Sequence, residues 1–231
     1  VIGVWCGCLL LSCVFVGIVL SVCRMISRAV LSSIQKRKET NEKKSQAFIF
    51  DHINSPLVSI IIPAYNEQVN ASRTVKSLIT QDYPSLEIIF VDDGSTDETY
   101  KIVKDAFNNV SNVHVLRKQN AGKATALNFG IQNSKAKYIV CIDADTQLKS
   151  DAVSLLMKYF DNEKVAAVAG NVKVGNEVNI ITKWQSIEYS TSQNFDRRAF
   201  YLLNCITVGH GAIGAVKKEA VIWLGGFTND I

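Results

Sequence analysis

Two aspartates close the apolar run at residues 138–142, in the order Asp143-Ala144-Asp145. In an extended chain the side chains at i and i+2 leave the same face, so the end of a buried strand would aim both carboxylates into one crevice. Two hard oxygen ligands with no Cys or His beside them suit Mg²⁺ or Mn²⁺ rather than zinc. The pattern therefore indicates a divalent metal site that takes further ligands from water or phosphate. An ordinary turn after a strand is the plain alternative.

Polar residues also follow three other apolar, β-branched runs. They are Pro63-Ala64-Tyr65-Asn66-Glu67, Asp92-Asp93-Gly94-Ser95 and Asn120-Ala121-Gly122-Lys123-Ala124. Each set by itself is typical of a turn or a helix cap. Open α/β sheets, however, bind their ligands beyond the carboxyl ends of the strands, which is where all four sets stand.

The residue types at these strand ends indicate a nucleotide diphosphate. Acidic side chains can accept hydrogen bonds from a nucleobase amide or a ribose hydroxyl. Lys123 stands beside Gly122 at an expected helix start, where it can meet a phosphate together with free backbone N–H groups. The sequence contains no GxxxxGK[ST], and no GxGxxG follows the first expected strand, which argues against a P-loop enzyme and a dinucleotide oxidoreductase. A nucleotide diphosphate that carries another group fits best.

Strand and helix patterns alternate through the part of the chain that carries these residues. Strands are expected at 58–62, 86–91, 113–116, 138–142 and 165–169, and helices at 67–81, 98–107, 123–132 and 151–160. This alternation predicts βαβ units, and nearly continuous apolar strands predict a mostly parallel sheet with helices on both faces. Residues 56–231 are enough for one such α/β domain.

Residues 1–23 carry no charge and no proline. At 1.5 Å per residue they are long enough to cross a hydrocarbon layer of about 30 Å, so we expect one transmembrane helix. A buried core helix is one alternative. A signal peptide is another, but its apolar region is shorter and its basic residues come first.

Residues 24–55 form a polar segment, read as a basic linker or a helix extension. Its cations are Arg24, Arg28, Lys36, Arg37, Lys38, Lys43 and Lys44. The positive-inside rule places this side of the span, and all residues after it, in the cytoplasm. The cluster accounts for most of the net charge of +4, so we expect anionic lipid headgroups and no nucleic acid as its partner.

The six cysteines carry no metal or disulfide signal. Four lie in the apolar segment, and no CxxC pair or Cys/His ligand spacing occurs. This usage agrees with a reducing cytosol.

The strand-end residues closely resemble family 2 glycosyltransferases of the GT-A fold. The matching motifs are Ile62-Pro-Ala-Tyr-Asn-Glu67, Val91-Asp-Asp-Gly-Ser-Thr-Asp97, Gly122-Lys-Ala124 with Ala126-Leu-Asn128, and Asp143-Ala-Asp145. The resemblance covers about residues 57–231 and predicts a GT-A, Rossmann-like domain after the transmembrane helix.

The resemblance implies a role for each matched residue. The uridine pocket of a UDP-sugar would be lined by Pro63, Ala64, Tyr65, Glu67, Asp92 and Asp93. Lys123 would lie near the nucleotide, while Asp143 and Asp145 would bind the diphosphate and a Mg²⁺ or Mn²⁺ ion.

Within the family, the chain is most similar to the membrane-bound processive synthases, above all the bacterial poly-β-1,6-N-acetylglucosamine synthases. The similar stretches are 168–176, 193–199 and 211–214. They are expected on the acceptor or sugar side of the site, with Asn171, Arg197 and Arg198 as candidates. Ordinary surface charge is the alternative for the two arginines.

The family's general base is an Asp in a Glu-Asp motif shortly after a Gly-Gly-Phe turn. Leu224-Gly-Gly-Phe227 supplies the turn, and Asp230 follows it too early. We therefore expect the base, a Gln-x-x-Arg-Trp motif and further transmembrane helices beyond Ile231, and the domain at 56–231 to be C-terminally incomplete.

These expectations combine into a membrane-anchored, inverting β-glycosyltransferase. It would transfer N-acetylglucosamine from UDP-GlcNAc to a growing polysaccharide at the cell membrane, with its catalytic domain in the cytoplasm and an accessory membrane subunit as a further partner. The alternatives are a hyaluronan, chitin or cellulose synthase, transfer of one sugar to a lipid carrier, and a non-catalytic subunit that binds nucleotide sugars.

Overall fold

The computed structural model describes residues 17–37, 55–173, 175, 179–190 and 213–228. The chain divides into two compact units. One joins Val1–Phe48 with Asn171–Val208, and the other joins Ile49–Gly170 with Gly209–Ile231. The second unit holds the strand-end motifs.

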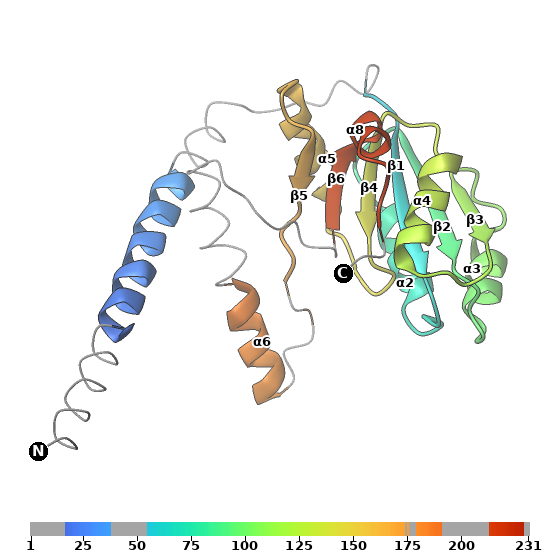
Figure 1. Cartoon of the computed structure of the whole chain (residues 1–231). Helices are drawn as coiled ribbons and strands as arrows, with labels where there is room; N and C mark the ends of the chain where they lie inside the picture. The colour runs from blue at the N-terminus through green and yellow to red at the C-terminus, as the bar shows by residue number, and fades with distance from the viewer. Residues whose placement is uncertain (1–16, 38–54, 174, 176–178, 191–212, 229–231) are drawn as a thin grey trace, which may run out of the picture. The chain divides into compact units, whose positions relative to one another are not determined.

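A six-stranded sheet forms the centre of the second unit (Figure 1), in the order β3-β2-β1-β4-β6-β5. The strands are β1 (Val58–Ala64), β2 (Leu86–Asp92), β3 (Val113–Arg117), β4 (Tyr138–Ile142), β5 (Ala167–Ala169) and β6 (Ile213–Lys217). The pairs β1/β2, β1/β4 and β2/β3 are parallel, whereas β6 runs antiparallel between β4 and β5. The predicted α/β fold with a mostly parallel sheet is confirmed.

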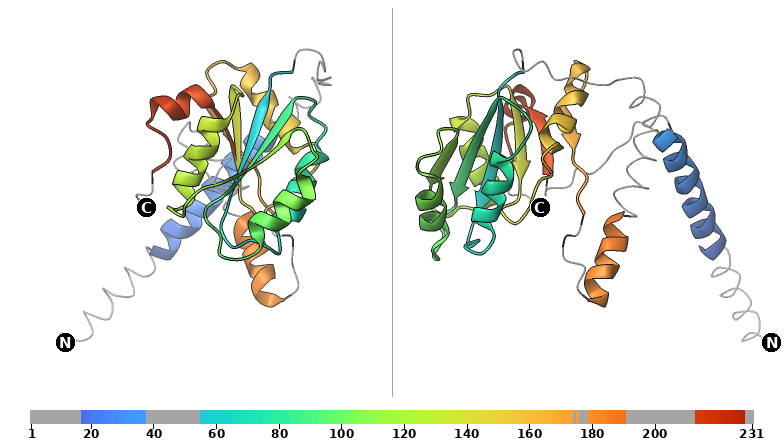
Figure 2. Two further views of the ribbon diagram at one scale, coloured as in Figure 1. Left: turned by 90° about the vertical axis from the view of Figure 1, so that its right-hand side faces the viewer. Right: turned by 180° about the vertical axis from the view of Figure 1, so that it is seen from behind.

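Helices cover both faces of this sheet. They are α2 (Ala71–Ile79), α3 (Thr99–Phe107), α4 (Lys123–Asn133), α5 (Ala152–Met157), which continues into the 3₁₀ turn η1 (Lys158–Asp161), and α8 (Lys218–Trp223). Figure 2 shows α4 and α8 on one side of the sheet and α2 and α3 on the other.

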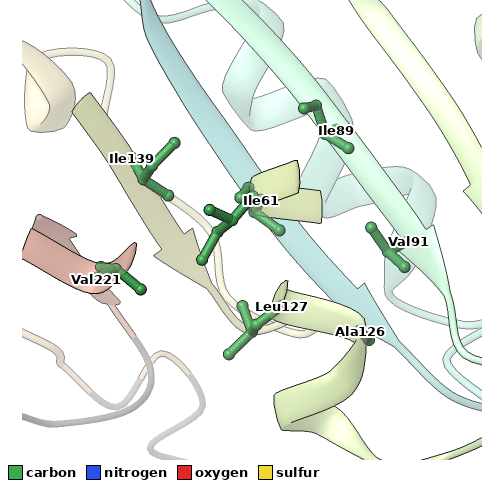
Figure 3. Packing of buried hydrophobic residues seen from close by; sticks show 8 residues of the cluster. Ile61, Ile89, Val91, Ala126, Leu127, Ile139 and Val221 are labelled. Carbon is green, nitrogen blue, oxygen red and sulfur yellow. The ribbon is translucent and has the colours of Figure 1, made fainter. Parts of the chain in front are cut away.

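Alternate strand residues supply the two halves of the core. On the α4 side, Ile61, Ile89, Val91 and Ile139 pack with Ala126, Leu127, Ile131 and Val221 (Figure 3). Their strand neighbours Ile60, Ile62, Ile88 and Phe90 are also fully buried, and they point to the opposite face because successive side chains in a strand alternate. Burial on both faces explains why these strands are apolar at nearly every position.

Three elements differ from the predicted pattern. The helix expected from residue 67 begins at Ala71, because the Glu67 carbonyl accepts a turn hydrogen bond from the Asn70 N–H at 3.1 Å. The strand expected from residue 165 is shorter, and β6 was not predicted. Strand β6 has only five residues with a glycine among them, and its place is set by pairing with β4 rather than by a local pattern.

Gly130 lets α4 approach the sheet closely. A Cβ at this position would lie 2.5 Å from Cγ2 of Ile61, whose side chain is fully buried. We expect Gly130→Ala to lower the free energy of unfolding by about 1 kcal/mol, since overpacking of about 1–3 kcal/mol outweighs the helix propensity gained. Urea unfolding followed by circular dichroism measures this. The Gly130→Ala/Ile61→Ala double variant should lose less free energy of unfolding than the sum of the losses of the two single variants. Additive losses would contradict a close contact between Gly130 and Ile61.

The first unit contains a helix at Gly17–Arg37 that is long and apolar enough, by length and composition, to cross a membrane, with a mean hydropathy of 1.5. Large apolar side chains such as Leu20 and Met25 are exposed on it, whereas the polar Ser32 and Gln35 are buried. Of the transmembrane segment predicted at 1–23, residues 1–16 lie outside the described residues. The first part of the predicted basic linker is helical as far as Arg37. The same unit holds α6 (Ile180–Ser190), on which Ile181 and Trp184 are exposed.

Candidate functional site

A cavity of about 230 Å³ opens at the carboxyl ends of the parallel strands. Its lining residues are Pro63, Ala64, Tyr65, Glu67, Asp93, Lys123, Asp143, Ala144 and Asp145. They come from the ends of β1, β2 and β4 and from the first residue of α4. The parallel register of these strands brings segments far apart in sequence to one edge.

The acidic pair lies where the strand pattern predicts it. Asp143 and Asp145 follow β4, and both line the cavity. The Lys123 ammonium forms an ion pair with Oδ1 of Asp143. Asp145 is exposed, and one of its oxygens accepts a hydrogen bond from the Thr146 hydroxyl at 3.4 Å. Asp145 therefore presents its carboxylate to the cavity at little structural cost.

These carboxylates fit a hard divalent cation. Among the described residues, no cluster of three or more His, Cys, Asp or Glu side chains could enclose a metal ion. Two carboxylates leave most of an octahedral shell to water and phosphate oxygens, as Mg²⁺ and Mn²⁺ prefer when they accompany a nucleotide.

Cys141 is no competing ligand. Burial raises the pKa of its thiol to about 12, the nearby Lys123 lowers it and Asp143 raises it further. The thiol is therefore protonated at neutral pH, and it packs against the hydrophobic core.

Asp93 has two functions in the structure. Its carboxylate forms an ion pair with Lys118 at 2.6 Å and accepts hydrogen bonds from the backbone N–H groups of Ala121 and Gly122, at 3.2 and 2.8 Å. It thus holds the loop before α4 in place. It also lines the cavity, where the oxygen that accepts the Gly122 bond has a further lone pair to offer.

Asp92 is buried and does not line the cavity. The residue is fully buried, and its Oδ2 receives Arg117 Nε at 3.1 Å and the Ser95 N–H at 3.3 Å. Its Oδ1 is buried without a hydrogen-bond partner among the described residues. Of the residues predicted for the uridine pocket, it is the one that the cavity does not include.

A set of cross-loop hydrogen bonds fixes the cavity wall. The Asn66 N–H donates to Ser95 Oγ at 3.0 Å, the Thr96 N–H donates to Asn66 Oδ1 at 2.9 Å, and the Glu67 N–H donates to Thr99 Oγ1 at 2.8 Å. Asn66 adopts a positive φ of 56°, which an asparagine tolerates better than most residues. The loops after β1 and β2 therefore form one rigid wall.

Asp97 adds to this wall. Desolvation raises the pKa of Asp97, but hydrogen bonds from Thr99 and Gln68 outweigh it, and the net effect lowers the pKa below the ordinary 3.8. The ionised Asp97 carboxylate therefore stabilises the fold fully at pH values above its ordinary pKa. This stabilisation is lost as the pH falls through the lowered pKa of the folded state.

Sequence reasoning missed two groups of supporting residues. Arg117 and Lys118 pair with Asp92 and Asp93 at the end of β2, and they stand at a strand end like the predicted residues. Asn128 belongs to a matched motif, but its role was not predicted. It joins α4 to the turn after α8: its Nδ2 donates to the Phe227 carbonyl at 2.8 Å, and its Oδ1 accepts from the Phe227 N–H at 2.9 Å. No local pattern indicates this pair, since 99 residues separate its members.

The predicted acceptor residues are not among the described residues that line the cavity. Asn171 is exposed and belongs to the first unit, whereas the cavity belongs to the second. Arg197 and Arg198 lie outside the described residues. Their assignment stays a prediction.

The mixed six-stranded sheet and the cavity at the carboxyl ends of its parallel strands define an α/β domain of the GT-A type. The family described as "Glycosyl transferase family 2" matches residues 59–223, and the chain belongs to that family. The fold is similar to that of a mannosyltransferase from Pyrobaculum calidifontis, solved in complex with GDP-mannose and Mn²⁺. That similarity has a TM-score of 0.64 at 25% identity and covers 93% of this chain and 59% of the other.

Among curated proteins, the chain is similar to poly-β-1,6-N-acetyl-D-glucosamine synthases of staphylococci. It is 33% identical to the Staphylococcus epidermidis protein over 195 residues, which is 84% of this chain and 47% of that protein. It is 29% identical to the Staphylococcus aureus protein over 215 residues, which is 93% of this chain and 50% of that protein. The chain thus spans about half the length of these relatives.

Proposed function

We propose that this chain is the sugar-donor-binding part of a membrane-anchored, inverting β-glycosyltransferase that builds poly-β-1,6-N-acetylglucosamine from UDP-GlcNAc. The observation that carries the proposal is the cavity that joins the residues after β1 and β2 to Lys123 and the Asp143/Asp145 pair. The residues after β1 and β2 offer an aromatic ring and carboxylates, and the residues near β4 and α4 offer a cation and two candidate metal ligands.

The nucleoside would occupy the end formed by the rigid wall. Tyr65 is half-exposed there and offers a ring face to a base, while Asp93 and Glu67 can accept from the base and the ribose. The similarity to synthases named for N-acetylglucosamine supports this sugar as the transferred group.

The diphosphate would lie between Lys123 and the acidic pair. A divalent ion held by Asp143 and Asp145 would supply charge neutralisation for the leaving diphosphate; the neighbour solved with Mn²⁺ supports this assignment. Lys123 would add an ammonium and the free N–H groups at the start of α4.

Transfer would proceed by one displacement. The acceptor hydroxyl attacks C1 of the sugar from the face opposite UDP, the C1–O bond to the diphosphate breaks, and its electron pair leaves with UDP. The hydroxyl proton passes to a carboxylate base, which by the family motif follows the Gly-Gly-Phe turn. Asn128 would help to position that turn against α4.

The membrane assignment rests on the N-terminal helix. The helix Gly17–Arg37 exposes apolar side chains and has basic residues in its second half. Lipid would cover this surface, and the positive-inside rule would place the cavity on the cytoplasmic side.

Radiolabelled UDP-GlcNAc supplied to the purified full-length protein in lipid vesicles, with Mn²⁺ or with EDTA, tests the proposal. We expect a metal-dependent product of high molecular mass that a glycosidase specific for β-1,6-linked N-acetylglucosamine degrades. Label that extracts into organic solvent as a single-sugar lipid would favour lipid-carrier transfer. A parallel reaction uses radiolabelled UDP-glucose, and a polymer formed in it would favour another synthase. Donor binding without product would favour the non-catalytic subunit.

A further inference from the structure

The ion pair between Lys123 and Asp143 joins the predicted phosphate ligand directly to a predicted metal ligand. Lys123 is the first residue of α4, and its ammonium reaches the Asp143 carboxylate at the end of β4. The two side chains remain 53% and 31% exposed, so the pair faces the cavity rather than the core.

Lys123 carries the only positive charge among the nine described residues that line the cavity, which include four carboxylates. The second lysine nearby, Lys118, is committed to Asp93, to the Gln119 carbonyl at 2.7 Å and to the Thr125 hydroxyl at 3.1 Å. The acidic pair at the end of β4 therefore has one cationic partner within this described lining.

A divalent ion at Asp143 would compete with this ammonium. Two cations on one carboxylate repel each other, so a metal that enters alone binds more weakly or displaces Lys123. A diphosphate changes the balance, because its oxygens supply both the released ammonium and the metal with new anionic partners.

We propose that Lys123 acts as a built-in counter-ion that couples metal binding to nucleotide binding. With the cavity free of nucleotide it holds Asp143 and weakens metal binding. With a nucleoside diphosphate present it transfers to the phosphates and releases Asp143 to the metal. By linkage, the metal and the nucleotide then strengthen each other's binding by the same factor. This inference rests on the proposed function, since it requires the metal site at Asp143 and Asp145.

Removal of the Lys123 charge should tighten Mn²⁺ binding in the absence of nucleotide and reduce the effect of UDP on Mn²⁺ binding. Lys123→Met keeps the length of the side chain and removes its charge. Without nucleotide, it should tighten Mn²⁺ binding about three- to fivefold, the scale of an exposed ion pair. The tightening of Mn²⁺ binding by UDP, which wild type should show, should shrink by about the same three- to fivefold factor in this variant, because the phosphates still ligate the metal.

The experiment is a Mn²⁺ titration of the purified full-length protein, with free Mn²⁺ followed by electron paramagnetic resonance, in the presence and absence of UDP. The Mn²⁺ that UDP binds in a protein-free titration is subtracted, so that only Mn²⁺ bound to the protein is compared. Lys101→Met is the matched control, because Lys101 pairs with Glu98 at 3.4 Å outside the cavity. The control should bind Mn²⁺ like wild type, and Lys123→Arg should keep the coupling.

The outcomes separate this inference from the proposed function. Equal Mn²⁺ affinity of wild type and Lys123→Met without UDP, with the UDP effect retained in both, would overturn the counter-ion role and leave the metal site standing. Absence of Mn²⁺ binding in every variant, with and without UDP, would overturn the metal site and the inference together.

Discussion

Asp145→Ala should lower the rate of sugar transfer at least about a hundredfold, the effect typical of losing one electrostatic stabiliser in a transition state. The carboxylate faces the cavity, and its oxygen accepts only a long hydrogen bond from Thr146 in the described structure. Because so little of the fold depends on it, the free energy of unfolding should change by less than about 0.5 kcal/mol. A large loss of rate without a loss of stability is the expected signature of a metal ligand.

The measurement is initial-rate incorporation of labelled sugar by the full-length enzyme over a range of Mn²⁺ concentrations. Asp105→Ala serves as the matched control, since Asp105 is an exposed carboxylate on α3 and does not line the cavity. Near-normal turnover of Asp145→Ala would show that the metal assignment is wrong. A rate that excess Mn²⁺ partly restores would support weakened metal binding as the cause.

Asp93→Ala should destabilise the second unit by about 3 kcal/mol and weaken nucleotide binding as well. Truncating one partner of a buried ion pair typically costs about 3–5 kcal/mol, because the other charge stays buried without compensation. Here the side chains of Lys118 and Asp93 are 17% and 4% exposed. The Ala121 and Gly122 N–H groups lose their acceptor too, so the loop that leads into α4 should loosen.

Urea unfolding and UDP titration of the same variants separate the two functions of Asp93. The double variant Lys118→Met/Asp93→Ala should recover part of the lost stability, since it removes the uncompensated charge, but should not recover UDP binding. If Asp93→Ala is too unstable to purify, Asp93→Asn retains the side-chain shape and permits the same comparison. If Asp93→Ala and Asp93→Asn were both as stable as wild type, the proposed function of Asp93 in holding the loop before α4 would be contradicted.

The sequence by itself determined the parts of this protein that depend on local physics. Apolar β-branched runs predicted β1 to β4, and β1, β2 and β4 are apolar at most positions because buried parallel strands are covered on both faces. The rule that ligands bind at the carboxyl ends of parallel strands then predicted that these motifs would meet. Of the eight residues predicted to bind UDP-sugar, the cavity includes seven, together with Asp145.

Only the tertiary structure decided which side chains support that cavity and how. Asp92 and Asp93 are adjacent and chemically identical, yet Asp92 is buried under Arg117 while Asp93 reaches the cavity and holds the loop at Gly122. Adjacent residues differ in this way because alternation in a strand sends them to opposite sides as the chain leaves the sheet.

The pairings of β6 with β4, of Asn128 with the turn at Phe227, and of Lys123 with Asp143 were likewise set by tertiary structure. They join segments between 20 and 99 residues apart in sequence. Bringing such segments together costs loop-closure entropy that only the whole fold offsets, so no local pattern records these contacts.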